Sequence, residues 1–392
     1  MKIIHDKIKV HSLTGRITID MMLKAFKAVK KNRGAAGIDR VTIAMYESNL
    51  SDNLNSLMRE LKGGLYMPKA LRRVHIDKGG GKTRPLGIPT VNCRVGQEVL
   101  RQLISPIFER RFHNNSFGFR PGRNCHQAVE RVMHYAQQGF KFVVDVDIKG
   151  FFDNIPLRLI MESLAAKIAD GNILNTIERL LNSGVIEDGV LKPTSRGTPQ
   201  GGVISPLLAN ATLEHLDWFL EENKLHFVRY ADDFVVLCKT KAEAEKALDA
   251  IQNFLQEMGL EVSPEKTKVT SFVEGFNFLG FTIKNCSIVM REKSKEKFKD
   301  AIRKITTRSH NLDKEVIEKL NRVIRGTVNY FGTKFSTMKV MFRELDKWIR
   351  KRIRCMKMKR IQHTDNIRLR ITFIKKIGLN SCLELYRARL SC

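Results

Sequence analysis

Acidic residues are scarce in this chain, which has 41 Asp and Glu against 69 Lys and Arg, a formal net charge of +28 over 392 residues. Such an excess goes beyond what solubility requires and indicates a polyanionic partner. Long apolar runs are also missing. Because no stretch of about 18 apolar residues occurs, we expect no transmembrane helix and no membrane partner. The first residues contain no apolar segment of a secretory signal.

Cysteine and histidine show no metal-binding pattern. The seven cysteines are scattered and never form C-x-x-C, which argues against a zinc ribbon or a disulfide framework and favours a reducing cytoplasm. The ten histidines lack ligand spacing, so we expect them to be structural or to face RNA. With 43% hydrophobic residues the chain can build cores, and its length is typical of two or three domains.

The positive charge is concentrated towards one end of the chain. Residues 286–392 contain 29 Lys and Arg and 10 Asp and Glu, a net charge of +19, so the remaining residues carry only +9. Charged helical surfaces usually alternate in sign. We therefore interpret this segment, with its cluster Arg350, Lys351 and Arg352, as a surface that follows nucleic-acid phosphates. An ordinary solvated helical surface is the alternative.

The spacing of apolar residues predicts a mixed α+β chain. Helices are expected within 20–62, 91–112 and 241–258, and strands within 71–89, 140–148, 226–238 and 275–283. From about residue 292 onward the pattern is helical throughout. The apolar stripe of its longest expected helix comprises Met341, Leu345, Trp348, Ile349, Ile353 and Met356. The clearest break in the pattern falls near 286–291.

Two adjacent carboxylates, Asp232 and Asp233, stand between two β-prone apolar runs. At the tip of a hairpin their like charges repel, and a divalent cation would remove this cost. Asp147 ends another apolar strand and would complete a two-metal site, whose ions lie about 3.5–4 Å apart. Asp145 shares the face of Asp147 and is expected to support it or to face solvent. Taken alone, Asp232-Asp233 fits a polar turn equally well.

A glycine-containing loop, 196–204, leads into a helix that Ser205 and Pro206 are suited to begin. Its glycines would let the backbone approach a ligand closely. By itself this feature is no more than a loop and a helix start.

In this order, the Asp strand, the Pro-Gln-Gly loop with its helix and the Tyr-Ala-Asp-Asp hairpin resemble the palm of reverse transcriptases. The closer resemblance is to the bacterial group II intron-encoded reverse transcriptases, also called maturases. It is carried by Ser116–Arg123, Thr198–Gly202, Ser205–Asn210 and Arg229–Asp233. The segment Ile324–Gly332 is similar to their thumb, the maturase-specific domain X. The resemblance covers about residues 20–360.

This resemblance implies a right-hand polymerase fold, with fingers, a palm built on an antiparallel sheet and an all-helical thumb. Residues 1–65 would form the N-terminal extension and first finger elements, 66–290 the fingers and palm, and 291–392 the basic thumb or maturase domain. It also implies an RNA-directed DNA polymerase that extends a DNA or RNA primer on an RNA template with dNTPs. The enzyme would bind group II intron RNA and assist splicing and mobility.

The resemblance assigns the catalytic triad to Asp147, Asp232 and Asp233. These residues would hold two Mg²⁺ ions, for which Mn²⁺ could substitute, and the Ile148 carbonyl would be a further ligand. Asp147 and Asp232 are the better candidates for direct metal ligation.

Other residues match the nucleotide site of the family. Lys78 and Arg84 match the fingertip cations that hold the incoming triphosphate, where a point charge and a planar fork both suit phosphate oxygens. Gln200 matches the loop residue that lines the dNTP site. Arg120, within the first motif, is expected to contact nucleic acid.

Two assignments have open alternatives. Phe152 matches the aromatic residue beneath the sugar, where a ribonucleotide 2′-hydroxyl would clash, although it could equally be a core residue. Lys266 is a candidate for the basic group near the leaving pyrophosphate, and Lys268 is its rival because the spacing suits both.

Two departures from the family stand out. No paired cysteines with an H-N-H core are present, so second-strand DNA cleavage is not expected, and Thr327 replaces the usual Trp. Two other functions remain open. One is a domesticated relative used in phage defence, repair or a CRISPR-linked system. The other is an RNA-binding splicing factor with an inactive polymerase, against which the intact Asp147, Asp232 and Asp233 argue.

Overall fold

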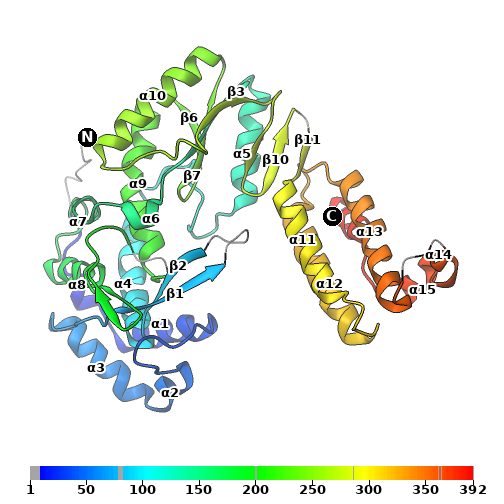
Figure 1. The fold of residues 1–392 in the computed structure, drawn as a ribbon. Coiled ribbons are helices and arrows are strands. Elements are labelled where there is room, and N and C mark those ends of the chain that lie inside the picture. Colours follow the sequence, from blue (N-terminus) through cyan, green and yellow to red (C-terminus); the bar gives the residue numbers. More distant parts are fainter. Residues whose placement is uncertain are drawn as a thin grey trace. The chain divides into compact units, whose positions relative to one another are not determined.

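The computed structural model describes residues 9–77, 83–198, 201–285, 287–360, 362 and 364–391. The chain divides into two compact units (Figure 1). The first unit contains the residues up to Tyr135 together with Val144–Val269, and the second contains Ala136–Val143 together with the residues from Thr270 onward. Both units combine helices with strands, as the apolar pattern predicted.

Helices near the N-terminus form one end of the first unit. They are α1 (Ile19–Lys31), α2 (Ile43–Ser48), α3 (Leu50–Lys62) and α4 (Val91–Glu109), after the 3₁₀ turn Thr14–Arg16. Thr18, Thr42 and Thr90 precede helices α1, α2 and α4, and each side chain accepts a hydrogen bond from a backbone N–H of the first turn. Helix α1 packs against α4, most of whose residues are buried.

A four-stranded sheet has the order β2-β1-β4-β5. Its strands are β1 (Leu71–Asp77), β2 (Thr83–Ile88), β4 (Val185–Glu187) and β5 (Val190–Lys192). Strands β1 and β2 are antiparallel and pair Ile76 with Arg84, which confirms the hairpin predicted within 71–89. The predicted tip of this hairpin, with Lys78, lies outside the described residues.

The sheet that carries the candidate site has the order β6-β7-β3-β8. Its strands are β3 (Phe142–Asp147), β6 (His226–Tyr230), β7 (Asp233–Cys238) and β8 (Lys268–Ser271). Four further helices of this unit are α6 (Phe151–Asn154), α7 (Leu157–Ala165), α8 (Gly171–Leu181) and α10 (Lys241–Glu257), and α5 (Cys125–Gln137) spans the unit boundary. Helix α9 (Ser205–Glu222) contacts α4, α7 and β6 and is buried along most of its length, so it forms the centre of this core.

The second unit begins with a three-stranded antiparallel sheet of β9 (Phe276–Phe278), β10 (Phe281–Lys284) and β11 (Ser287–Met290). The change from strands to helices that the sequence predicted near 286–291 falls between Met290 and Glu292. This sheet belongs to the same compact unit as the helices that follow it. The reason is aromatic packing, because the Phe281 ring lies 5.8 Å from Tyr330 and 5.1 Å from Phe331, measured between ring centroids.

The rest of the second unit is helical, as the sequence predicted. Its helices are α11 (Glu292–Ile305), α12 (Lys314–Phe331), α13 (Lys339–Met358), α14 (Asp365–Arg368), α15 (Ile371–Lys376) and α16 (Cys382–Ser391). The predicted long amphipathic helix is α13, whose Leu345, Ile349 and Ile353 are buried. Among the described residues, no helix combines the length and apolar character that a membrane span requires.

Candidate active site

Asp232 and Asp233 lie at the tip of the β6–β7 hairpin, as the sequence predicted. The strands pair Tyr230 with Asp233, so Ala231 and Asp232 alone make the turn. Ala231 has a φ of 59°, a left-handed conformation that a residue other than glycine seldom adopts. Gly118 packs against this turn so closely that a Cβ atom there would lie 2.4 Å from the Ala231 nitrogen. Only glycine fits at position 118 while the turn keeps this place.

Asp147 ends β3, the strand next to β7 in the sheet. Its carboxylate Oδ2 accepts a hydrogen bond of 2.8 Å from the Lys266 Nζ atom. The Asp147 carbonyl accepts another from the Ser263 N–H at 2.7 Å. Of the two lysines that the spacing left open, Lys266 is therefore the one in contact with Asp147. Lys268 begins β8, and its charge acts on Asp145.

The acidic side chains influence one another electrostatically. Burial raises the pKa of Asp232, and the negative charge of Asp147 raises it further, whereas the charges of Arg84 and Lys266 lower it. Burial likewise raises the pKa of Asp145 to about 6. The ionised form of Asp232 is thus disfavoured by desolvation and by a like charge, and a nearby cation would relieve both.

The donor chemistry here fits a divalent cation. Carboxylate and carbonyl oxygens are the ligands that Mg²⁺ prefers. The residue after Asp147, Ile148, bridges Val262. The two backbone bonds of this bridge use the Asp147 carbonyl and the Lys149 N–H, rather than the Ile148 carbonyl. Within the part of the chain that is described, no three Asp, Glu, His or Cys side chains converge on one point.

Aromatic rings lie beside the hairpin. Phe152 is half-buried, whereas its neighbour Phe151 is fully buried and is the core residue of the pair. The Phe152 ring lies 6.4 Å from Phe119, and the Phe119 ring lies 6.5 Å from Tyr230. Phe152 also lines a cavity of about 270 Å³ with Arg73 and other residues of the first unit.

Phe119 was not predicted from the sequence. It is 57% exposed and has a φ of 58°, a conformation that is rare for an aromatic residue and that marks functional sites more often than ordinary surface. Its place beside Gly118, in a motif of alternating Phe and Gly, was the available signal.

Two arginines expected to contact nucleic acid have hydrogen-bond partners inside the protein. Arg120 is 8% exposed, and its guanidinium contacts Glu109 at 3.1 Å and the carbonyl of His113 at 2.7 Å. Arg352 donates to the Thr306 carbonyl at 2.8 Å, just beyond the end of α11. Both guanidinium groups thus have acceptors within the protein, and their contacts with nucleic acid stay predictions.

The other predicted site residues are placed as follows. Arg84 is exposed on β2, Arg350 is half-buried on α13, and Lys351 is exposed on the same helix. Gln200, like Lys78, lies outside the described residues.

A buried arginine behind the hairpin was also missed. Arg229 lies in β6 and is 0% exposed. It follows the apolar residues Phe227 and Val228 in the sequence. An arginine within an apolar strand was the signal that the sequence offered, because such a charge needs partners in the interior.

The family described as reverse transcriptase (RNA-dependent DNA polymerase) matches residues 76–283, and the group II intron maturase-specific domain matches residues 295–372. The protein YkfC of Escherichia coli is 32% identical over 302 residues, which are 67% of this chain and 79% of that protein.

Two relatives are named after introns. The group II intron-encoded protein LtrA of Lactococcus lactis subsp. cremoris is 29% identical over 333 residues, which are 68% of this chain and 55% of that protein. An uncharacterized 91 kDa protein in the cob intron of Schizosaccharomyces pombe is 30% identical over 326 residues, which are 67% of this chain and 40% of that protein. The chain thus spans about half the length of these two relatives.

Proposed function

Because this chain belongs to the reverse transcriptase family and carries a group II intron maturase-specific domain, we propose that it copies RNA into DNA at the site formed by Asp147, Asp232 and Asp233. The observation that carries this proposal is the β6–β7 hairpin, which presents two carboxylates beside the end of β3. Family membership confirms the predicted right-hand polymerase fold and the predicted class of enzyme, an RNA-directed DNA polymerase.

The reaction joins the primer to the incoming dNTP. The primer 3′-hydroxyl loses its proton to solvent water as its oxygen bonds to the α-phosphorus, and the bond from this phosphorus to the bridging oxygen breaks to release pyrophosphate. Two Mg²⁺ ions, or Mn²⁺ in their place, would be held by the three aspartates and the Ile148 carbonyl, and when bound they stabilise charge on the attacking and leaving oxygens.

The chain's own cations orient the reacting groups. Lys266 fixes the rotamer of the Asp147 carboxylate through its 2.8 Å contact. It also brings positive charge to the place where charge develops on the leaving pyrophosphate. The exposed guanidinium of Arg84 offers a planar fork that suits the triphosphate oxygens. These contacts position the nucleotide before the reaction, which lowers its entropic barrier.

Phe152 supplies selectivity for the sugar. Its ring is half-buried beside Phe119, so its edge is held in place by packing while part of the ring remains accessible. A 2′-hydroxyl on the nucleotide above this ring would overlap it, and such overlap is costly in a packed site. Deoxyribonucleotides lack this hydroxyl and fit.

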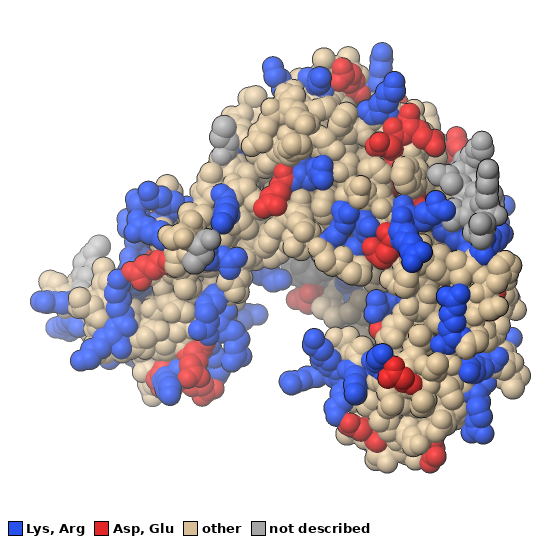
Figure 2. Space-filling view, turned by 180° about the vertical axis from the view of Figure 1, so that it is seen from behind, with Lys and Arg blue, Asp and Glu red and all other residues tan. Residues whose placement is uncertain are grey.

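Intron RNA is the partner that we assign to the second unit. Ten acidic side chains in residues 286–392 cannot neutralise 29 basic ones by one-to-one pairing. Figure 2 shows far more Lys and Arg than Asp and Glu on the face of the molecule that it presents. The maturase-specific match covers most of this segment. The names of LtrA and of the protein in the cob intron favour an intron partner over a domesticated role.

A primer-extension assay tests the proposed activity. The full chain is supplied with an RNA template, an annealed DNA primer, dNTPs and Mg²⁺. Asp147→Asn, which removes the charge and keeps the shape, is expected to lower the extension rate by about a thousandfold, because charge stabilisation at the reacting oxygens is lost. Asp249→Asn, an exposed carboxylate on α10, is the matched control and is expected to retain full activity. Extension by Asp147→Asn at the wild-type rate would refute the assignment.

A further inference from the structure

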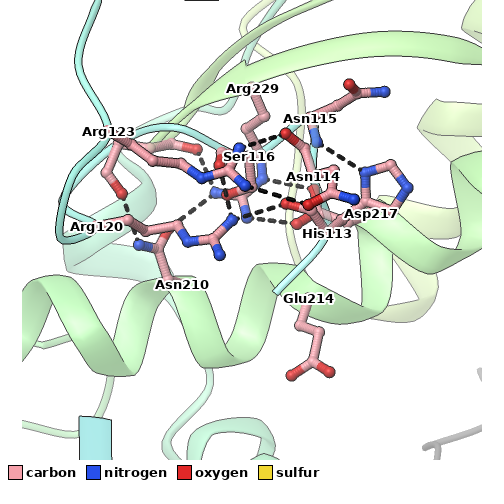
Figure 3. Close-up of polar contacts among 12 residues, drawn as sticks. His113, Asn114, Asn115, Ser116, Arg120, Arg123, Asn210, Glu214, Asp217 and Arg229 are labelled. Carbon is pink, nitrogen blue, oxygen red and sulfur yellow. Dashed lines mark hydrogen bonds and ion pairs between the residues drawn. The ribbon is translucent and has the colours of Figure 1, made fainter. Parts of the chain in front are cut away.

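The Arg229 side chain is fully buried, and its guanidinium donates four hydrogen bonds (Figure 3). Its Nε and Nη2 atoms each contact one carboxylate oxygen of Asp217, both at 2.6 Å. Its Nη1 atom donates to the Asn210 side-chain oxygen and to the Ala231 carbonyl, both at 2.9 Å. Asp217 and Asn210 both belong to α9. The arginine therefore ties the turn that bears Asp232 to the central helix of this unit.

The same residue is held through its backbone. The Arg229 N–H donates to the Asn115 carbonyl at 2.9 Å, and its carbonyl accepts from the Phe117 N–H at 2.8 Å. Asn210 in turn donates to the Gly118 carbonyl at 2.8 Å. Three segments thus meet at one residue: the loop that includes Gly118, the β6–β7 hairpin and α9. The loop is the one whose glycine packs against the turn.

A buried ion pair is weak evidence for stability, because apolar residues of similar volume often serve as well. What an apolar residue could not do here is hold the Ala231 carbonyl. Ala231 has a left-handed φ of 59°, and such conformations persist only where the surroundings enforce them. The Arg229 contact and the close approach of Gly118 are two constraints on this turn.

We propose that Arg229 is a positioning residue of the polymerase site. Its guanidinium, oriented by Asp217 and Asn210, fixes the Ala231 carbonyl and thereby the direction in which Asp232 and Asp233 project. This inference rests on the proposed function, and it adds residues behind the hairpin that touch neither nucleotide nor metal. Its consequence is that loss of the network lowers the rate of the chemical step more than it lowers substrate binding.

Helix α9 provides a matched control. Glu214 lies one helical turn before Asp217 and contacts Lys167 at 2.7 Å, with side chains that are 5% and 3% exposed. This second buried pair joins α9 to the residues after α7, and Lys167 lies over the Phe108 ring rather than at the hairpin. Asp217→Asn and Glu214→Gln therefore remove one carboxylate charge each from the same helix, and each leaves a buried cation behind.

The experiment measures single-nucleotide incorporation under steady-state conditions, together with the melting temperature and the affinity for template RNA. Arg229→Lys keeps the charge and loses the fork, and Asn210→Ala leaves the ion pair with Asp217 in place. For Arg229→Lys and Asp217→Asn we expect kcat to fall by about 10- to 100-fold, the effect of a small misplacement of reacting groups. For Asn210→Ala we expect kcat to fall by at least about fivefold. For all three, the dNTP KM and the RNA affinity should stay within about twofold. Glu214→Gln should lower the melting temperature as Asp217→Asn does and leave kcat unchanged.

Two outcomes would overturn the inference: an unchanged kcat in Arg229→Lys and Asn210→Ala, or equal losses of kcat in Asp217→Asn and Glu214→Gln. If the Arg229→Lys variant does not fold, the kcat of Asn210→Ala alone tests the inference. Asp147→Asn is run in parallel. An active Asp147→Asn variant would refute the proposed function. An active Arg229→Lys variant beside an inactive Asp147→Asn variant would refute only the role assigned to Arg229.

Discussion

Among the described residues of the first compact unit, four lysine and arginine side chains are buried. Arg94 donates to the Ala35 carbonyl at 2.6 Å, and the other three each contact a carboxylate. They are Arg229 with Asp217, Arg120 with Glu109 and Lys167 with Glu214. In the second unit, no lysine or arginine among the described residues is buried, although this unit is the more basic one. Its buried charged groups are acidic, and Asp346 accepts hydrogen bonds from the N–H groups of Cys382 and Leu383 at the start of α16.

The difference shows two uses of positive charge. A buried cation with a fixed partner holds one geometry, and its replacement changes how precisely neighbouring groups are placed. An exposed cation on a helix contributes long-range attraction to phosphates, which depends on salt and on the number of such groups. We therefore expect substitutions in the first unit to change rates and substitutions in the second unit to change affinities.

The largest effect should come from Asp232→Ala. DNA synthesis on an RNA template should be abolished, because stabilisation worth several kcal/mol, about 3 or more, is lost at the reacting oxygens. Binding of structured RNA should remain at the wild-type affinity, since it depends on the second unit. Primer extension and RNA affinity are measured on the same preparation. A parallel loss of RNA binding would contradict the assignment of catalysis to the first unit and of RNA binding to the second.

Reversal of two positive charges on α13, in the second unit, should have the next largest effect. Arg350→Glu combined with Lys351→Glu should weaken RNA binding about tenfold or more near physiological salt and flatten the dependence of affinity on salt. Arg352 is left unchanged because it binds Thr306. Lys241→Glu with Lys246→Glu, on the exposed face of α10, is the control. Equal losses in both double variants would show that no particular surface binds the RNA.

A smaller effect is expected at Phe152. Phe152→Val should raise ribonucleotide incorporation relative to deoxyribonucleotide incorporation by about tenfold, because the clash with the 2′-hydroxyl is removed. The half-buried ring predicts only a small loss of melting temperature. Unchanged sugar selectivity together with a large loss of melting temperature would assign Phe152 to the core.

The smallest effect should follow Thr240→Ala. The Thr240 side chain accepts a hydrogen bond from the Glu243 N–H and completes a capping box at the start of α10. Its loss should cost about 1 kcal/mol of stability, seen as a slightly lower melting temperature, with kcat and RNA affinity unchanged. A change in kcat would mean that α10 affects the site, which the comparison of the two units does not anticipate.

The sequence was informative where function or packing leaves a local pattern. The apolar runs around Asp232 and Asp233 predicted the hairpin, and the periodic stripe of residues 341–356 predicted α13. A cation whose partner lies inside the protein leaves no such pattern. Arg120 and Arg352 read as surface charges, and only the fold shows that carbonyls at distant positions accept their hydrogen bonds.

Contacts between distant segments could likewise not be predicted from the sequence. Arg229 finds its side-chain partners on α9 and its backbone partners at Asn115 and Phe117. The exposure of Phe119 depends on the same loop. Neither arrangement can be read from spacing, because nothing in the local sequence says which helix will cover a strand.

The strand order of the catalytic sheet also has a consequence for how the protein is made. Strand β3 lies between β7 and β8, both of which follow it in the chain by a long interval. During synthesis, its apolar residues Val143, Val144 and Val146 leave the ribosome well before either neighbour exists. Pairing between such distant segments is slow, and an unpaired apolar strand is prone to aggregate in the meantime. A nascent chain therefore has to be protected until Ser271 has emerged and β8 can complete the sheet.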